Sequence, residues 1–168
     1  MAHERDLLAR VARRDEASFQ RLYDEFATRI FRYAITILRN RHLAEEVVQE
    51  TMITVWDKAS TYVGSSRVST WIFGIARHKA YDILKGEKKG GRTADVSAVM
   101  DDPAPAIERE IQVYTALDGL PPDQREIVFL TFYENLPYRA IASLLEIPEG
   151  TVKSRMYHAK KKLTEALS

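Results

Sequence analysis

The chain of 168 residues contains no cysteine. This absence excludes disulfide bonds, thiol catalysis and metal sites with thiolate ligands, and it fits a reducing cytoplasm. Long apolar runs are missing as well, since no stretch approaches the roughly 18 apolar residues of a membrane span. The charged N-terminal residues also lack the apolar centre of a signal peptide. We therefore expect a cytoplasmic protein that does not insert into a membrane.

The motifs of common enzymes are missing too. The sequence has no glycine-rich phosphate loop, no nucleophile motif and no carboxylate–histidine group on a shared face. Its histidines, His3, His42, His78 and His158, stand singly, without the spacing of metal ligands. We expect no catalytic activity, no metal site and no cofactor.

Charged residues make up an ordinary 29% of the chain, but they are segregated, although the net charge is only +1. The helix expected at Leu43–Ala59 places apolar residues on one face. The opposite face carries a stripe with acidic side chains, which we call the acidic stripe. Its members are Glu46, Gln49, Glu50, Ile53 and Asp57. The residues alone leave open whether the stripe docks a partner or is only a solvated helix face.

The next expected helix, which begins near Trp71, has the opposite electrical character. Between Arg77 and Arg92, six Lys and Arg residues stand against two acids. Ser69 or Thr70 is a plausible N-cap. The face expected to be buried is aliphatic and consists of Ile72, Ile75, Ala76, Ala80, Ile83 and Leu84. Aromatic and basic residues are expected mostly off that face; they are Trp71, Phe73, Arg77, His78, Tyr81 and Lys85. Trp56 and Trp71 can each be plain core residues.

Helical periodicity extends over most of the chain, and no strand is indicated. A short helix around Leu7–Val11 and a long amphipathic helix from about Asp15 to Leu38 precede the two charged helices. We expect an all-α fold with two small helical domains, residues 1–88 and 107–168. Residues 89–106 are expected to form a flexible linker, because glycines, aspartates and prolines interrupt any helical period.

The C-terminal part has the layout of a helix-turn-helix. A short apolar helix opened by Pro137 is followed by a turn, which Gly150 is expected to serve, and by a final helix from about Thr151. Five Lys and Arg residues and no acid lie between Thr151 and Leu163. A helix in the major groove of DNA needs such cations and long polar side chains. A three-helix bundle without DNA function can share the layout.

Three blocks stand in order along the chain: LAEEVVQETMITVWDKA, STWIFGIARHKAYDIL and LPPDQREIVFLTFYENLPYRAIASLLEIPEGTVKSRMYHAKKKL. Together they resemble bacterial RNA polymerase sigma factors of the extracytoplasmic-function (ECF) group of the sigma-70 family. The resemblance covers about Asp15 to Leu163. It implies a transcription initiation factor that binds core RNA polymerase and confers promoter recognition and strand opening. The alternative is a stand-alone helix-turn-helix regulator that does not bind the polymerase.

The resemblance also implies a division of labour. The acidic stripe would dock on a coiled coil of the polymerase's largest subunit. The loop and helix after it would recognise and melt the minus-ten element, through Tyr62, Ser65, Ser66, Arg67, Trp71, Arg77, His78, Tyr81 and Lys85. The helix-turn-helix would bind the minus-thirty-five element, through Arg139, Thr151, Lys153, Ser154, Arg155, Tyr157, His158 and Lys161. An anti-sigma protein is a further partner that the resemblance allows.

Two residues depart from the family pattern. Many members carry Asn near the position of His78, and many have a more basic tail to that helix than the one interrupted here by Glu87. The base preferred at the minus-ten element therefore stays open.

Overall fold

The computed structural model describes residues 2–90 and 116–167. Every regular element within these ranges is a helix, as the periodicity predicts. The chain divides into two compact units, Met1–Val96 and Ser97–Ser168, and each is described by itself. None of the described helices combines the length and the apolar character that a membrane crossing needs.

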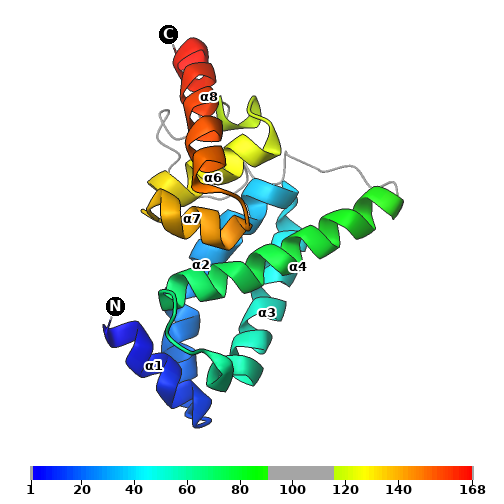
Figure 1. The fold of residues 1–168 in the computed structure, drawn as a ribbon. Helices are drawn as coiled ribbons and strands as arrows, with labels where there is room; N and C mark the ends of the chain where they lie inside the picture. The colour runs from blue at the N-terminus through cyan, green and yellow to red at the C-terminus, as the bar shows by residue number, and fades with distance from the viewer. Residues whose placement is uncertain (1, 91–115, 168) are drawn as a thin grey trace. The chain divides into compact units, whose positions relative to one another are not determined.

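The first unit is a bundle of helices (Figure 1). Its elements are α1 (Ala2–Ala12), α2 (Glu16–Leu38), α3 (Arg41–Lys58), the 3₁₀ turn η1 (Ala59–Thr61) and α4 (Val68–Gly90). Helix α2 packs against α1, α3 and α4, so it is the central helix of the bundle.

Local hydrogen bonds fix the turn between α2 and α3, after Leu38, where the sequence predicts the end of the long helix. Arg39 ends α2 in the left-handed region, with φ 53°, and its N–H donates to the carbonyl of Ile35. Asn40 then caps α3, because its side chain accepts a hydrogen bond of 3.0 Å from the N–H of Leu43. At the start of α2, the carboxylate of Asp15 instead accepts from the hydroxyl of Ser18 at 2.6 Å.

Helix α4 begins earlier than expected. The N–H of Trp71 donates to the carbonyl of Arg67, so the first turn starts at Val68. Ser69 and Thr70 are buried inside this turn. The expectation that one of them is the N-cap was therefore wrong.

The buried face of α4 also differs from the aliphatic stripe expected. Phe73 is fully buried, and its ring centre lies 5.3 Å from that of Tyr33 and 6.5 Å from that of Phe26, both on α2. The expectation that Phe73 lies off the core face was wrong, because α2 presents aromatic rings that pack edge-on against it. Ile75 is correspondingly only half-buried.

Helix α4 continues through Gly86 to Gly90, so the first two residues of the expected linker belong to the helix. A single glycine lowers helix propensity by about 1 kcal/mol but need not end a helix. The rest of the expected linker and residues 107–115 of the expected C-terminal domain lie outside the described residues.

Three α-helices lie wholly within the described part of the second unit. They are α6 (Pro122–Phe132), α7 (Tyr138–Leu145) and α8 (Glu149–Leu167). Helix α6 begins with Pro122, where the missing N–H leaves no hydrogen bond unmade. The core side chains Ile127, Leu130, Ile141 and Val152 are fully buried, and each of the three helices contributes at least one of them.

Replacement of Phe73 tests the corrected face of α4. We expect Phe73→Ala to lower the free energy of unfolding by about 3–5 kcal/mol, because it leaves a cavity between α4 and α2. The measurement is urea denaturation of the full chain. The control is His78→Ala on the exposed side of α4, which should change stability by about 0.5 kcal/mol or less. Equal, small changes in the free energy of unfolding for both variants would show that Phe73 lies at the surface.

Candidate nucleic-acid interface

The acidic stripe lies on the outward face of α3. Its members Glu46, Gln49 and Asp57 are exposed, Ile53 is 60% exposed, and Glu50 is half-buried. The side chains of its four polar members make no ion pair and no hydrogen bond with another described residue. The neighbouring Glu45 does, since it pairs with Arg41 at 3.4 Å. The stripe therefore combines available negative charge with an exposed aliphatic side chain.

The opposite face of α3 fixes the direction of the stripe. Its apolar residues Ala44, Val47, Met52 and Val55 are buried, as the periodicity predicts. Trp56 is only half-buried rather than a full core residue, and its ring meets that of Phe19 edge-on at 5.2 Å.

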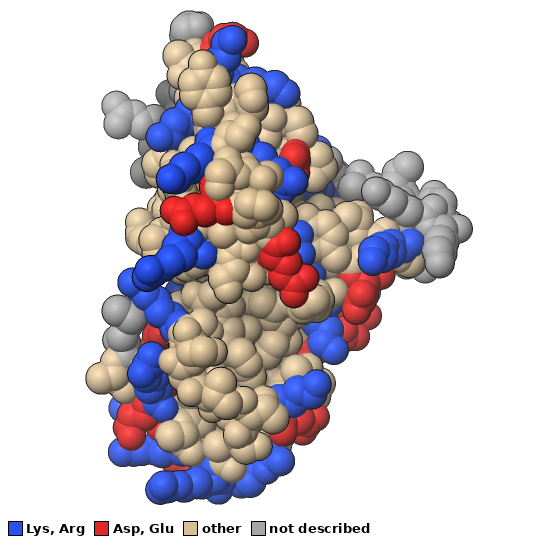
Figure 2. Space-filling model, in the orientation of Figure 1, with Lys and Arg blue, Asp and Glu red and all other residues tan. Residues whose placement is uncertain are grey.

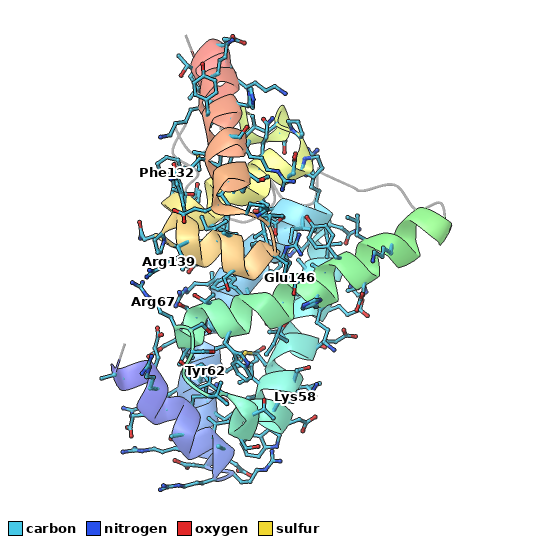
Figure 3. All side chains as sticks on the ribbon, in the orientation of Figure 1. Lys58, Tyr62, Arg67, Phe132, Arg139 and Glu146 are labelled. Atoms are coloured by element: carbon cyan, nitrogen blue, oxygen red, sulfur yellow. The ribbon has the colours of Figure 1, made fainter. Side chains whose placement is uncertain are left out.

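Residues 62–67 form a loop between η1 and α4, which we call the minus-ten loop after the role expected for it (Figure 3). The hydroxyl of Tyr62 donates to the carbonyl of Ser66, and its ring lies 5.6 Å from that of Trp71. Gly64 adopts φ 82°, in the left-handed region that glycine favours. Val63, which the sequence analysis did not single out, is 85% exposed. The loop is closed by the hydrogen bond from Tyr62 and exposes Val63, Ser65 and Arg67.

The predicted minus-ten residues differ in accessibility. Tyr62 and Trp71 are half-buried against each other, and Ser66 is also half-buried. Ser65 and Arg67 are exposed. The structure thus brings the loop residues and the start of α4 together, but the rings of Tyr62 and Trp71 are partly buried in their contact with each other.

Further along α4, basic and aromatic side chains occupy the outward face. The guanidinium carbon of Arg77 lies 4.4 Å from the centre of the Tyr81 ring, a cation–π contact. His78 and Lys85 are exposed, and Tyr81 is half-buried. This face offers ring surfaces and cations, which are the groups that hold single-stranded nucleic acid.

The turn of the helix-turn-helix depends on Glu146. This residue ends α7 with φ 58°, and its N–H donates to the carbonyls of Ala142 and Ser143. Gly150 instead lies in the first turn of α8, which begins at Glu149 rather than near Thr151. The expectation that Gly150 serves the turn was wrong, because backbone hydrogen bonds hold a non-glycine residue in the left-handed region.

The predicted minus-thirty-five residues lie mainly on the exposed side of α8. Lys153, Ser154, Tyr157, His158 and Lys161 are exposed, and Thr151 is half-buried. Arg139 is exposed on α7 (Figure 3). Buried Val152, Met156 and Ala159 point α8 in this direction. On the face drawn in Figure 2, Lys and Arg side chains follow much of α8.

Lys153 pairs with Glu149 of its own helix at 3.9 Å, whereas Arg155 pairs with another helix. The Nε of Arg155 lies 3.5 Å from a carboxylate oxygen of Asp123, at the start of α6. Only 32% of the Arg155 side chain is exposed. Two exposed aromatic residues, Phe132 and Tyr133, end α6 and were not predicted as surface residues.

The chain matches known proteins along both units. Residues 22–90 match the family model described as sigma-70 region 2, and residues 110–163 match sigma-70, region 4. The ECF RNA polymerase sigma factor SigK of Mycobacterium ulcerans is 31% identical over 171 residues, which cover 96% of this chain and 91% of that protein. The chain belongs to the ECF sigma factors of the sigma-70 family.

Two further likenesses agree with this assignment. The ECF RNA polymerase sigma factor RpoE of Cereibacter sphaeroides is 32% identical, with 92% of this chain and 89% of that protein covered. The sigma factor RpoE of Bartonella quintana, solved in complex with the anti-sigma factor NepR, has a TM-score of 0.75 at 25% identity. That likeness covers 89% of this chain and 96% of that one. This sigma factor is thus a transcription initiation factor, and the stand-alone regulator is not favoured.

A pair of substitutions tests the corrected turn of the helix-turn-helix. Gly150→Ala should raise the free energy of unfolding by about 0.4–1 kcal/mol, because a Cβ at this helical position meets no atom within 4 Å. Glu146→Gly should be tolerated, because its backbone is in the region that glycine favours. Both are measured by urea denaturation. A clear loss of stability in Gly150→Ala would show that Gly150 forms the turn after all.

Proposed function

We propose that the two parts of this sigma factor divide the recognition of promoters between them. Residues 1–88 dock on core RNA polymerase and act on the minus-ten element, and residues 107–168 bind the minus-thirty-five element. Residues 89–106 join the two as a linker. The sigma factor works in the cytoplasm and performs no chemistry, because the polymerase supplies the nucleotidyl transfer.

The observation that carries this proposal is the separation of charge within the first unit. Helix α3 presents unpaired acids outward, whereas α4 presents cations and aromatic rings. An acidic surface repels DNA, so the two faces suit two different partners. The acidic stripe would contact the coiled coil of the largest polymerase subunit, with Ile53 in the centre of the contact and the acids around it.

The minus-ten loop and α4 are suited to opening DNA. A base that leaves the duplex loses its stacking and pairing, which costs a few kcal/mol. Stacking on an aromatic side chain returns about 1–3 kcal/mol per base. In the proposal, the loop residues from Tyr62 to Arg67 hold the flipped base, and the face of Trp71, His78 and Tyr81 carries the non-template strand. Arg77 and Lys85 lie near the phosphates.

For the minus-thirty-five element, the exposed side of α8 enters the major groove. Lys153, Ser154, Tyr157 and His158 are closest to the base edges, and Arg139 and Lys161 bind phosphates. We propose a different role for Arg155. Its ion pair with Asp123 supports it as a brace between α8 and α6, which holds the recognition helix in place.

An anti-sigma protein is proposed as a regulator of this sigma factor. The support is the likeness to the Bartonella quintana sigma factor, which was solved with its anti-sigma factor NepR. Such a protein would keep the sigma factor from the polymerase until a signal releases it.

Charge reversal on α3 tests the docking face. Glu50→Lys together with Asp57→Lys should weaken binding to core polymerase by about tenfold or more. An acidic stripe suits a basic partner surface, and the new lysines would repel such a surface. Binding is measured by fluorescence titration with purified core enzyme. Glu45→Lys is a matched control outside the stripe, and circular dichroism checks the fold. Full affinity in a folded double variant would rule out this face as the docking site.

Truncation on α8 tests the second DNA surface. Lys153→Ala with Tyr157→Ala should lower the affinity of the holoenzyme for a minus-thirty-five element by about ten- to a hundredfold, because a good base contact contributes about 1–3 kcal/mol. Band-shift titration on matched and mutated elements measures this loss. Core binding should be unchanged. An equal loss on both DNA sequences would assign these residues to the phosphate backbone.

A further inference from the structure

Two arginines near the two ends of α1 donate hydrogen bonds to the backbone of the segment that carries the minus-ten loop. Nη1 of Arg14 lies 2.8 Å from the carbonyl oxygen of Trp56, at the end of α3. Nη2 of Arg5 lies 3.5 Å from the carbonyl oxygen of Gly64, in the loop itself. Neither arginine belongs to the sequence motifs of the DNA surface. Both contacts join parts of the chain more than forty residues apart, since the separations are 42 and 59 residues.

Helix α1 is a firm base for these contacts. Its residues Leu7, Leu8 and Val11 have at most 1% of their surface exposed. The helix packs on α2 and also contacts η1, which leads into the loop. A side chain that extends from such an anchored helix can hold a loop in place, because its own backbone does not move with the loop.

Arg14 also contacts the side chain of Trp56. Its guanidinium carbon lies 5.1 Å from the centre of the Trp56 ring. The ring of Phe19 packs edge-on against the same ring, with the two ring centres 5.2 Å apart. The carbonyl of Trp56 is one of the last four of α3, which have no partner inside the helix. A cation there also interacts favourably with the helix dipole.

The backbone conformation of Arg14 indicates that its side chain contributes to the structure. Its φ of 68° lies in the left-handed region, where a residue with a Cβ is less stable than glycine by about 1–2 kcal/mol. Glycine would suit this turn between α1 and α2 better. The contacts with Trp56 offset that cost.

The minus-ten loop has few other restraints. Tyr62 closes it through the carbonyl of Ser66 and the ring of Trp71, but Val63 is 85% exposed and Gly64 has a left-handed backbone. The hydrogen bond from Arg5 ends on the carbonyl of Gly64 itself. It therefore restrains the peptide that is otherwise free to turn.

We propose that Arg5 and Arg14 are positioning residues that hold residues 56–64 in the shape that captures a flipped base. Arg14 fixes the segment where it leaves α3, and Arg5 fixes it within the loop. A loop that is ordered before DNA arrives loses less conformational entropy on binding. The two arginines act through the backbone and do not contact DNA. This inference rests on the proposed minus-ten function of the loop.

The variants for the test are Arg5→Ala and Arg14→Gly, with Arg5→Lys and Arg14→Lys as conservative replacements. Arg14→Gly removes the side chain and also relieves the left-handed backbone, so a loss of function does not come from strain. Arg13→Ala is the matched control. Arg13 is exposed in the same turn, and its side chain makes no hydrogen bond or ion pair with a residue of the described ranges.

The first measurement needs no DNA. Amide hydrogen exchange of the full chain should become faster within residues 56–67 in Arg5→Ala and Arg14→Gly but not in Arg13→Ala. The second measurement uses holoenzyme made with core polymerase and a promoter with 2-aminopurine in the minus-ten element. Fluorescence should report about three- to tenfold less opening for the two variants, with unchanged core affinity and substantial recovery in the lysine variants.

The salt dependence of opening separates positioning from direct contact. If Arg5 or Arg14 bound a phosphate, its removal would lower the slope of log affinity against log salt by about 1. An unchanged slope supports positioning. A lowered slope, unchanged exchange in the loop, or unchanged opening would each overturn the proposal. If wild-type holoenzyme opens no promoter, the proposed function itself fails and this inference falls with it.

Discussion

The contact of Phe73 with the rings of Tyr33 and Phe26 determines how α4 sits on the first unit. Successive residues of a helix are rotated by about 100°, so one buried side chain fixes the direction of all the others. With Phe73, Ile72 and Ala76 buried, the face with His78 and Lys85 is left to solvent. An inward turn of that face would bury cations, which is unfavourable without partners. The proposed DNA surface of α4 therefore depends on an aromatic contact that lies behind it.

Periodicity could predict α3 much better than α4, and the reason is physical. On α3, the aliphatic residues other than Ile53 recur on one face at helical spacing, so burial of that face directs the stripe outward. On α4, aromatic residues stand on both sides, and spacing alone does not say which ring is buried. The choice of Phe73 depends on rings of α2 that are forty or more residues away in sequence. The turn at Glu146 was similarly hidden, because local rules favour glycine in the left-handed region.

The positions of the candidate surfaces could be predicted from the charge of the sequence, but the ion pairs and hydrogen bonds of their residues could not. The sequence shows that α8 is basic, yet only the fold brings Arg155 to Asp123 at the start of α6. It shows arginines on α1, yet only the fold brings Arg5 to the carbonyl of Gly64. A charged residue that already has a partner contributes less to a ligand, since breaking the existing contact reduces the gain. Composition therefore identifies a surface, and contacts decide which of its residues are available.

The end of α3 links the two proposed activities of the first unit. Asp57, in the acidic stripe, directly follows Trp56, which packs under Arg14 and against Phe19. The same helix end continues through η1 into the minus-ten loop. A polymerase subunit held on the stripe would thus be connected to the loop by the short turn η1, which contacts α1 and α3. Such a connection would set the distance and angle between the docking contact and the captured base, and this is what a factor that aligns a polymerase with a melted strand requires.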